Sequence, residues 1–162
     1  MKILFLQTGG TIDKDYPKRY QGYHFEIATP AIIPILEKVN PNFTYEVDSI
    51  LKKDSMDITS ADRDKIYQAC KKARDDKIII THGTDSMVQT AEKLSSIRDK
   101  VIILTGSLRP EKFVNSDAMF NIGTAVGAIN VLANGVYIAM NGRIYTWDNC
   151  VKTESGVFIE KF

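Results

Sequence analysis

The chain has 162 residues, of which 44% are hydrophobic and 25% charged, and its formal net charge is +1. This composition is typical of a soluble globular domain, and the near-neutral charge argues against the concentrated basic surface of a nucleic-acid-binding protein. No apolar run reaches membrane-spanning length and residues 3–6 are too short for a signal-peptide core, so we expect a cytoplasmic protein. The two cysteines and two histidines have no metal-ligand spacing, which argues against a metal site, a disulfide framework and a Ser-His-Asp triad.

The first strand is expected over residues 2–7, a short apolar run that leads directly into a glycine-containing turn. Gly10 and Thr11 lie in this turn, where glycine lets the backbone bend tightly or approach a ligand. The turn lacks the G-x-G-x-x-G spacing of a dinucleotide site. Residues 13–25 follow without any period and are rich in tyrosine, which favours a mobile loop. A loop of this length is often an active-site lid, although a plain surface loop is the alternative.

A helix, a strand and a second helix are expected next along the chain. Residues 31–39 have helical spacing, and residues 44–51 partly alternate as a strand does. A polar loop over residues 52–57 contains Ser55 and forms another candidate strand-end site. Residues 60–73 then predict a helix with one apolar face and one charged face.

The most informative stretch is residues 78–87, which read Ile-Ile-Ile-Thr-His-Gly-Thr-Asp-Ser-Met. The β-branched run predicts a strand buried on both faces, and helical spacing resumes at the end of the stretch. Gly83 permits close approach of a substrate, while Thr84 and Asp85 place a hydroxyl and a carboxylate beside backbone N–H groups. The alternative is that Asp85 or Ser86 only caps the helix.

The second half of the chain repeats the strand–turn–helix pattern. Residues 101–104 predict a buried strand that ends in a turn containing Ser107, and residues 116–132 predict a helix. The small residues within this helix, among them Gly123 and Gly127, indicate close packing against another helix.

Two further strands are expected over residues 136–140 and 143–145, joined by an Asn-Gly turn at residues 141–142. The tail over residues 147–162 is expected to be irregular. Strands alternating with helices predict an α/β fold, a three-layer sandwich with a largely parallel central sheet and helices on both faces, flavodoxin-like. Without a linker or repeat, we expect one domain over residues 1–162.

The turns at the carboxyl ends of parallel strands meet at one edge of such a sheet. They would gather a hydroxyl-rich set with one carboxylate, and this set comprises Thr11, Ser55, Thr84, Asp85 and Ser107. A threonine hydroxyl becomes a useful nucleophile only when a base takes its proton. Lys152 or a loop tyrosine is a candidate base, although a solvated surface lysine is the simpler interpretation of Lys152 taken alone. Backbone N–H groups of the glycine-rich turns could stabilise an oxyanion, so the set favours amide or ester hydrolysis.

These motifs resemble the bacterial-type L-asparaginases, over essentially the whole chain but only over that family's amino-terminal domain. The Thr-His-Gly-Thr-Asp-Ser-Met segment at residues 81–87 is the most specific, supported by Gly-Gly-Thr-Ile at 9–12, Leu-Thr-Gly-Ser-Leu-Arg-Pro at 104–110 and Asp-Ala-Met-Phe-Asn at 117–121. The resemblance implies hydrolysis of asparagine to aspartate and ammonia without metal or cofactor. Its implied catalytic residues are the nucleophile Thr11, an assisting Tyr16 or Tyr23 with preference for Tyr16, and the group Thr84, Asp85 and Lys152. The implied substrate-binding residues are Gly10, Ser55 for the α-carboxylate, Gly83, and Ser107 for the amide pocket, with Asp85 also meeting the α-ammonium.

The sequence departs from the family pattern in three ways. Ser86 replaces the usual threonine, and Ser107 stands where alanine is common. The chain ends at Phe162, whereas most members continue into a second domain, so the resemblance implies a short-chain, single-domain form in which another assembly closes the site, with a homodimer or homotetramer expected. Two alternatives stay open. One is a related amidase acting on glutamine or a charged-tRNA-type substrate, the latter disfavoured by the near-neutral charge, and the other is a non-catalytic amino-acid-binding module.

Overall fold

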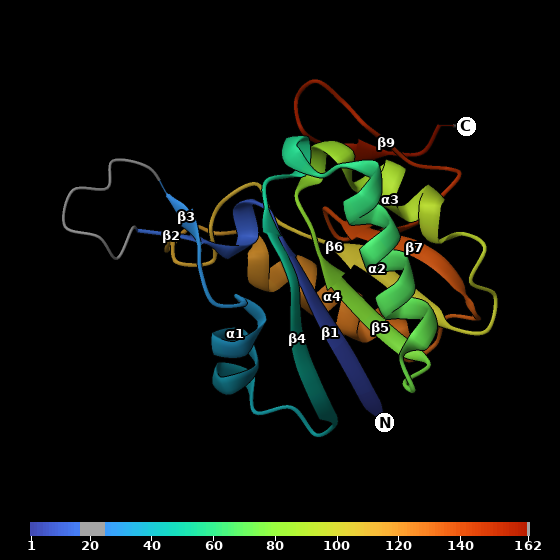
Figure 1. Cartoon of the computed structure of the whole chain (residues 1–162). Helices are drawn as coiled ribbons and strands as arrows, with labels where there is room; N and C mark the ends of the chain where they lie inside the picture. Colours follow the sequence, from blue (N-terminus) through green and yellow to red (C-terminus); the bar gives the residue numbers. More distant parts are fainter. Residues whose placement is uncertain (17–24, 162) are drawn as a thin grey trace.

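A twisted six-stranded sheet organises the molecule, whose computed structural model describes residues 1–16 and 25–161 (Figure 1). The strand order is β4-β1-β5-β6-β7-β8, and every neighbouring pair is parallel except β7 and β8. The first five of these strands have the doubly wound order 2-1-3-4-5 of flavodoxin-like folds, which confirms the predicted fold class. The strands are β1 (Lys2–Gly9), β4 (Thr44–Lys53), β5 (Lys77–Thr81), β6 (Val101–Thr105), β7 (Gly135–Met140) and β8 (Arg143–Thr146).

Two helices cover each face of the sheet, and alternating side chains of the central strands fill both cores (Figure 1). On one face α2 (Ser60–Lys72) and α3 (Met87–Leu94) pack over Ile78 and Ile80 of β5. On the other face α1 (Ile32–Val39) and α4 (Ala118–Ile129) pack over Ile79. Because successive strand residues point to opposite faces, a continuous isoleucine run is what a strand covered on both sides requires.

Short elements surround the carboxyl end of the sheet and refine the predicted loops. Two segments predicted without strands in fact contain short antiparallel pairs: the candidate lid has β2 (Lys14–Asp15) with β3 (Glu26–Ile27), and the tail has β9 (Val151–Lys152) with β10 (Phe158–Ile159). The tail is therefore not irregular as predicted, because Phe158 anchors it by burying its ring in the core and its carbonyl accepts a hydrogen bond from the Tyr145 hydroxyl. Three 3₁₀ turns complete this end of the molecule, η1 (Thr11–Asp13), η2 (Ser55–Asp57) and η3 (Thr84–Ser86).

The prediction of close helix packing at the glycines of α4 is wrong. A Cβ added to Gly123 or Gly127 would meet nothing within 4 Å in the described part of the chain, and neighbouring Phe120 is 63% exposed. The apolar side of α4 that faces the sheet consists instead of Ile122, Ala125 and other residues four or three positions apart.

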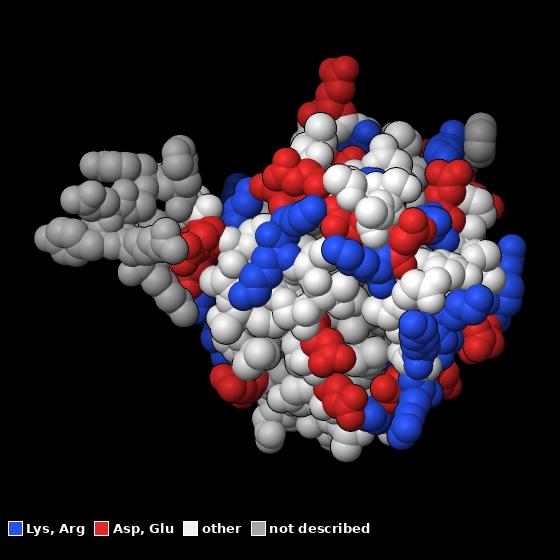
Figure 2. Space-filling view, viewed as in Figure 1, with Lys and Arg blue, Asp and Glu red and all other residues white. Residues whose placement is uncertain are grey.

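No helix in residues 1–16 and 25–161 combines the length and the apolar character needed to cross a membrane. Figure 2 shows Lys and Arg side chains interspersed with Asp and Glu over the visible face. On this face, charges of both signs are mixed and no single sign dominates.

Candidate active site

Three turns at the carboxyl edge of the sheet lie in direct backbone contact. Gly10 has a positive φ of 86°, and a Cβ added there would meet the backbone of Gly83. A Cβ on Gly83 would in turn lie 2.6 Å from Cβ of Ser55. Glycine at both positions therefore lets the turns that carry Thr11, Ser55 and Thr84 approach one another.

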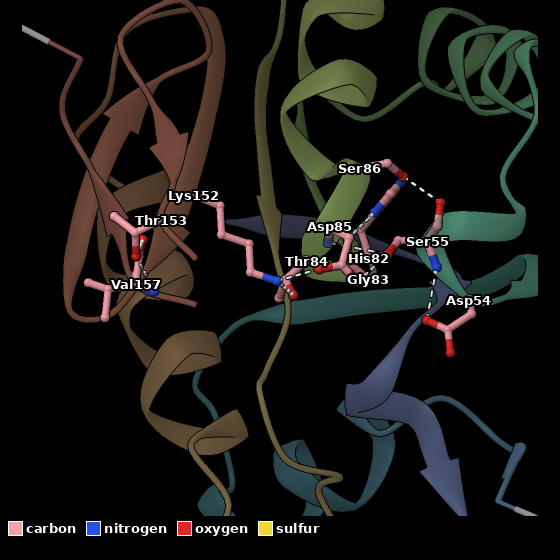
Figure 3. Close-up of polar contacts among 10 residues, drawn as sticks. All are labelled: Asp54, Ser55, His82, Gly83, Thr84, Asp85, Ser86, Lys152, Thr153 and Val157. Carbon is pink, nitrogen blue, oxygen red and sulfur yellow. Dashed lines mark hydrogen bonds and ion pairs between the residues drawn. The ribbon is translucent and has the colours of Figure 1, made fainter. Parts of the chain in front are cut away.

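Ser55 and Asp85 are joined by two hydrogen bonds between their turns (Figure 3). The backbone N–H of Asp85 donates to Ser55 Oγ at 3.2 Å, and Ser55 Oγ lies 3.4 Å from Asp85 Oδ2. Ser86 Oγ donates to the Ser55 carbonyl at 2.6 Å, which ties the same two turns at a second point. Ser86 thus positions the turn, and its side chain makes no capping hydrogen bond to α3.

Lys152 reaches from β9 across to Thr84 and Asp85 (Figure 3). Its Nζ donates to Thr84 Oγ1 at 2.8 Å and forms an ion pair with Asp85 Oδ1 at 2.5 Å. The Lys152 side chain is only 21% exposed, so it is not the freely solvated lysine of the simpler interpretation. The hydrogen bond from Lys152 is also the main cause that holds the pKa of Asp85 below its usual range. The three side chains form one hydrogen-bonded group, an arrangement of the kind that can transfer protons.

A buried hydrogen-bond chain behind the turn fixes its backbone. His82 is fully buried, and burial lowers its pKa to about 4, so the ring is neutral near pH 7. Its Nδ1–H donates to the Gly83 carbonyl at 2.7 Å, which leaves Nε2 to accept from the Thr90 hydroxyl at 2.9 Å. Arg63 Nε donates to the same hydroxyl at 3.2 Å. This chain makes His82 a structural support for the turn and not a proton carrier.

Replacing Thr90 by valine should lower the free energy of unfolding by about 1–3 kcal/mol, because it leaves the buried His82 Nε2 without its donor. The measurement is a urea titration of both proteins at pH 7. The matched control is Thr124→Val, since the exposed Thr124 hydroxyl bonds only to a carbonyl of its own helix. Equal losses of stability in the two variants would contradict the assigned role of Thr90.

Asp13 is a buried carboxylate two residues after Thr11, and it ties three segments together. It is 2% exposed, its Oδ1 accepts from the Ala31 N–H at 2.7 Å, and its Oδ2 accepts from the Thr81 hydroxyl at 3.3 Å. Burial raises its pKa from 3.8 to about 6, against the opposing effect of these donors. Asp13 therefore holds the turn of Thr11 against the end of β5.

The pKa of Asp13 predicts how its contribution to stability depends on pH. Because the folded value near 6 lies above the ordinary 3.8, the contribution is fully present below pH 3.8 and is lost as the pH rises through 6. The advantage of the wild type over Asp13→Asn in free energy of unfolding should thus fall by about 2 kcal/mol between pH 4 and pH 7. Urea titrations of both proteins across this range measure the difference. Parallel stability curves would rule out the assigned titration.

The other predicted site residues in the described part of the chain, Thr11, Tyr16 and Ser107, make no hydrogen bond to Thr84, Asp85 or Lys152. In the described part of the chain, no hydrogen bond joins the Thr11 hydroxyl to another residue. Tyr16 is 69% exposed and packs its ring on Phe25, with centroids 5.2 Å apart. Ser107 is buried and donates its hydroxyl to the Arg109 carbonyl at 2.5 Å. Tyr23 lies outside the described residues.

An open pocket of about 420 Å³ lies beside Asp85 and Lys152, lined also by residues 153–156 of the turn between β9 and β10. Among residues 1–16 and 25–161, no cluster of three or more His, Cys, Asp or Glu side chains is arranged to hold a metal ion. The side chains that line the pocket supply the carboxylates of Asp85 and Glu154, the ammonium group of Lys152, and the hydroxyls of Thr153 and Ser155.

Two of these supporting residues were not singled out from the sequence. Thr90 lies among the apolar residues that follow Met87 at helical spacing. A polar residue on an otherwise apolar helix face is the sequence signal that could have indicated a buried hydrogen bond there. Asp13 falls in the predicted mobile loop, and no local pattern in the sequence marks it as buried.

Comparisons with known proteins agree with this geometry. Residues 2–158 match the family model described as Asparaginase, N-terminal. The chain is 35% identical over 161 residues to an L-asparaginase from Thermococcus kodakarensis, covering 96% of this chain and 48% of that protein. The solved thermostable L-asparaginase from the same organism superposes with a TM-score of 0.86 at 32% identity, over 99% of this chain and 51% of the other.

A shorter match extends to a Glutaminase-asparaginase from Pseudomonas fluorescens biotype A, at 40% identity over 74 residues, 43% of this chain and 20% of that protein. Almost all of this chain matches these L-asparaginases, but it spans only about half of their length.

Proposed function

Because the chain belongs to the asparaginase family, we propose that it hydrolyses the side-chain amide of L-asparagine to L-aspartate and ammonia through a threonine nucleophile. The observation that carries the proposal is the contact of Lys152 with both Thr84 and Asp85 at the edge where the turn of Thr11 lies. We propose residues 1–162 as one catalytic domain that needs neither metal nor cofactor. A cytoplasmic location and a homodimeric or homotetrameric state stay predictions.

The proposed reaction begins with attack of Thr11 Oγ1 on the side-chain amide carbon of asparagine. The resulting oxyanion would be stabilised by backbone N–H groups of the surrounding turns. Collapse of the tetrahedral intermediate releases ammonia and leaves an acyl ester on Thr11, which water then hydrolyses to aspartate. Each proton transfer needs a group near the reacting atoms, and we assign this role to Lys152 and Thr84, with Tyr16 assisting.

Substrate binding is assigned to the neighbouring groups of the same cluster. Ser55 would hold the α-carboxylate and Asp85 the α-ammonium. The two Asp85 oxygens face different partners, Oδ1 toward Lys152 and Oδ2 toward Ser55, so one carboxylate can link catalysis to substrate binding. Gly10 and Gly83 leave the space for the substrate backbone, and Ser107 is proposed to line the amide pocket.

The test is ammonia and aspartate release from L-asparagine by the purified chain, with L-glutamine in parallel. We expect equal amounts of ammonia and aspartate from asparagine and slower release from glutamine. An identically purified Thr11→Ala variant controls for enzyme carried over from the expression host. No ammonia from either substrate, with aspartate still raising the melting temperature, would replace the proposal by an amino-acid-binding module.

A second candidate function is glutamine hydrolysis by the same residues. The similarity of part of the chain to a protein named Glutaminase-asparaginase supports it. Glutamine turnover that exceeds asparagine turnover would select this candidate.

A further inference from the structure

Ser55, the residue proposed to hold the substrate's α-carboxylate, lies between two carboxylates. Its backbone N–H donates to Asp54 Oδ1 at 3.0 Å, and its hydroxyl lies 3.4 Å from Asp85 Oδ2. An anionic group bound at Ser55 would therefore meet two carboxylates, of which Asp85 is already paired with Lys152, so the charge of Asp54 is the one left to be balanced. A positively charged side chain close to Ser55 is therefore needed before the substrate's α-carboxylate can bind there.

Lys14 supplies a positive charge at this position. Its Nζ lies 2.5 Å from Asp54 Oδ2, on the carboxylate whose other oxygen accepts from Ser55. Although Lys152 is the main cause of the low pKa of Asp85, the charge of Lys14 contributes to it, so Lys14 also acts on the second carboxylate. Lys14 belongs to β2, three residues after Thr11, and thus to the segment that carries the proposed nucleophile.

Two other lysines, Lys152 and Lys53, are held by other carboxylates. Lys152 is bound to Thr84 and Asp85, while Lys53 points to Asp62 of α2, with Nζ 2.7 Å from Oδ2. The Lys14 side chain is 25% exposed, and an ammonium group has three N–H donors. Lys14 can therefore keep its bond to Asp54 and still donate to a ligand oxygen beside Ser55.

We propose that Lys14 is a specificity-determining residue that binds the α-carboxylate of the substrate together with Ser55. The inference rests on the proposed function, since it takes the substrate to be a free amino acid bound at Ser55. It follows that the site requires a substrate with a free α-carboxylate beside its α-ammonium group. An asparagine whose carboxyl group is esterified or in a peptide bond cannot make this ion pair.

The test compares Lys14→Met with the wild type on two substrates, L-asparagine and L-asparagine methyl ester, which keeps the side-chain amide but lacks the carboxylate charge. We expect the variant to raise KM for asparagine about ten-fold, as for loss of a charge-assisted hydrogen bond, and to leave KM for the ester unchanged. Lys14→Arg should restore most of the affinity because it keeps the charge. The matched control is Lys93→Met, which breaks the Lys93–Asp64 ion pair between α3 and α2.

Two outcomes overturn the inference. An equal rise in KM for asparagine and its ester would show that Lys14 only supports the fold of its turn. Recovery of asparagine affinity in the Lys14→Met, Asp54→Asn double variant would show that Lys14 only neutralises Asp54, without contacting the substrate.

Calorimetric binding of L-aspartate separates this inference from the proposed function. Aspartate binding that weakens about ten-fold in Lys14→Met, in a chain that releases no ammonia, would support the inference while the hydrolase proposal fails. Normal hydrolysis with aspartate affinity unchanged in the variant would retain the hydrolase proposal and reject the role of Lys14.

Discussion

Thr11→Ala is expected to lower kcat for asparagine by about four orders of magnitude, because the variant has no hydroxyl to form the acyl intermediate. Binding should persist, since the residues proposed to hold the substrate are unchanged. The measurement combines steady-state ammonia release with calorimetric binding of aspartate, for which we expect the wild-type affinity. A comparable loss of both would assign Thr11 to binding and not to catalysis.

Two further variants make the result for Thr11 specific. Thr11→Ser keeps a hydroxyl and should retain activity within about ten-fold of the wild type, because only a methyl group is lost. Thr44→Ala removes an exposed threonine hydroxyl at the opposite, amino end of the parallel sheet and should leave kcat unchanged. Activity of Thr11→Ala close to that of the wild type would transfer the nucleophile role to another residue, with Thr84 the next candidate.

Lys152→Met is expected to lower kcat by about three orders of magnitude, within the range for removal of a general acid–base group. The variant removes the donor to Thr84 Oγ1 and the ion pair of Asp85 in one step. Since Lys152 is the main cause of the low pKa of Asp85, that pKa should rise in the variant. Measuring kcat and kcat/KM between pH 4 and pH 9 would report both effects.

Lys152→Arg distinguishes positive charge from proton transfer. Arginine stays protonated over this pH range, so it can replace the ion pair but cannot accept a proton. We expect Lys152→Arg to retain substrate affinity and to remain slow. The control is Lys65→Met, which removes a lysine that is 65% exposed on α2. A fast Lys152→Arg variant would contradict the proton-transfer role.

The sheet and the nature of the site could be predicted from sequence because both depend on local pattern. The isoleucine run of β5 and the glycine turn after it allow few structures other than a buried strand that ends near a ligand. The location of Lys152 was not predictable in this way, because its neighbours in sequence give no period. Its place beside Thr84 depends on the tail hairpin, in which Lys152 of β9 lies opposite Phe158 of β10 and Phe158 is buried in the core.

The errors have equally specific causes. Glycines within an apolar helix suggested a close partner at Gly123, but composition alone does not say which side of a helix faces the core. The burial of Asp13 depends on donors supplied by Ala31 and Thr81, which lie 18 and 68 residues away in the sequence. Such long-range pairing has no local signature, so a polar loop and a buried carboxylate look alike until the chain is folded.

The contact between Gly10 and Gly83 restricts how this site can change during evolution. A side chain at Gly10 would meet backbone atoms of Gly83, so no smaller side chain at position 83 could make room for it. Paired substitutions cannot compensate for each other here, as they often do where two side chains touch. New substrate preferences should therefore arise through the side chains around the turns, at positions such as Lys14 and Ser107, while the two glycines stay fixed.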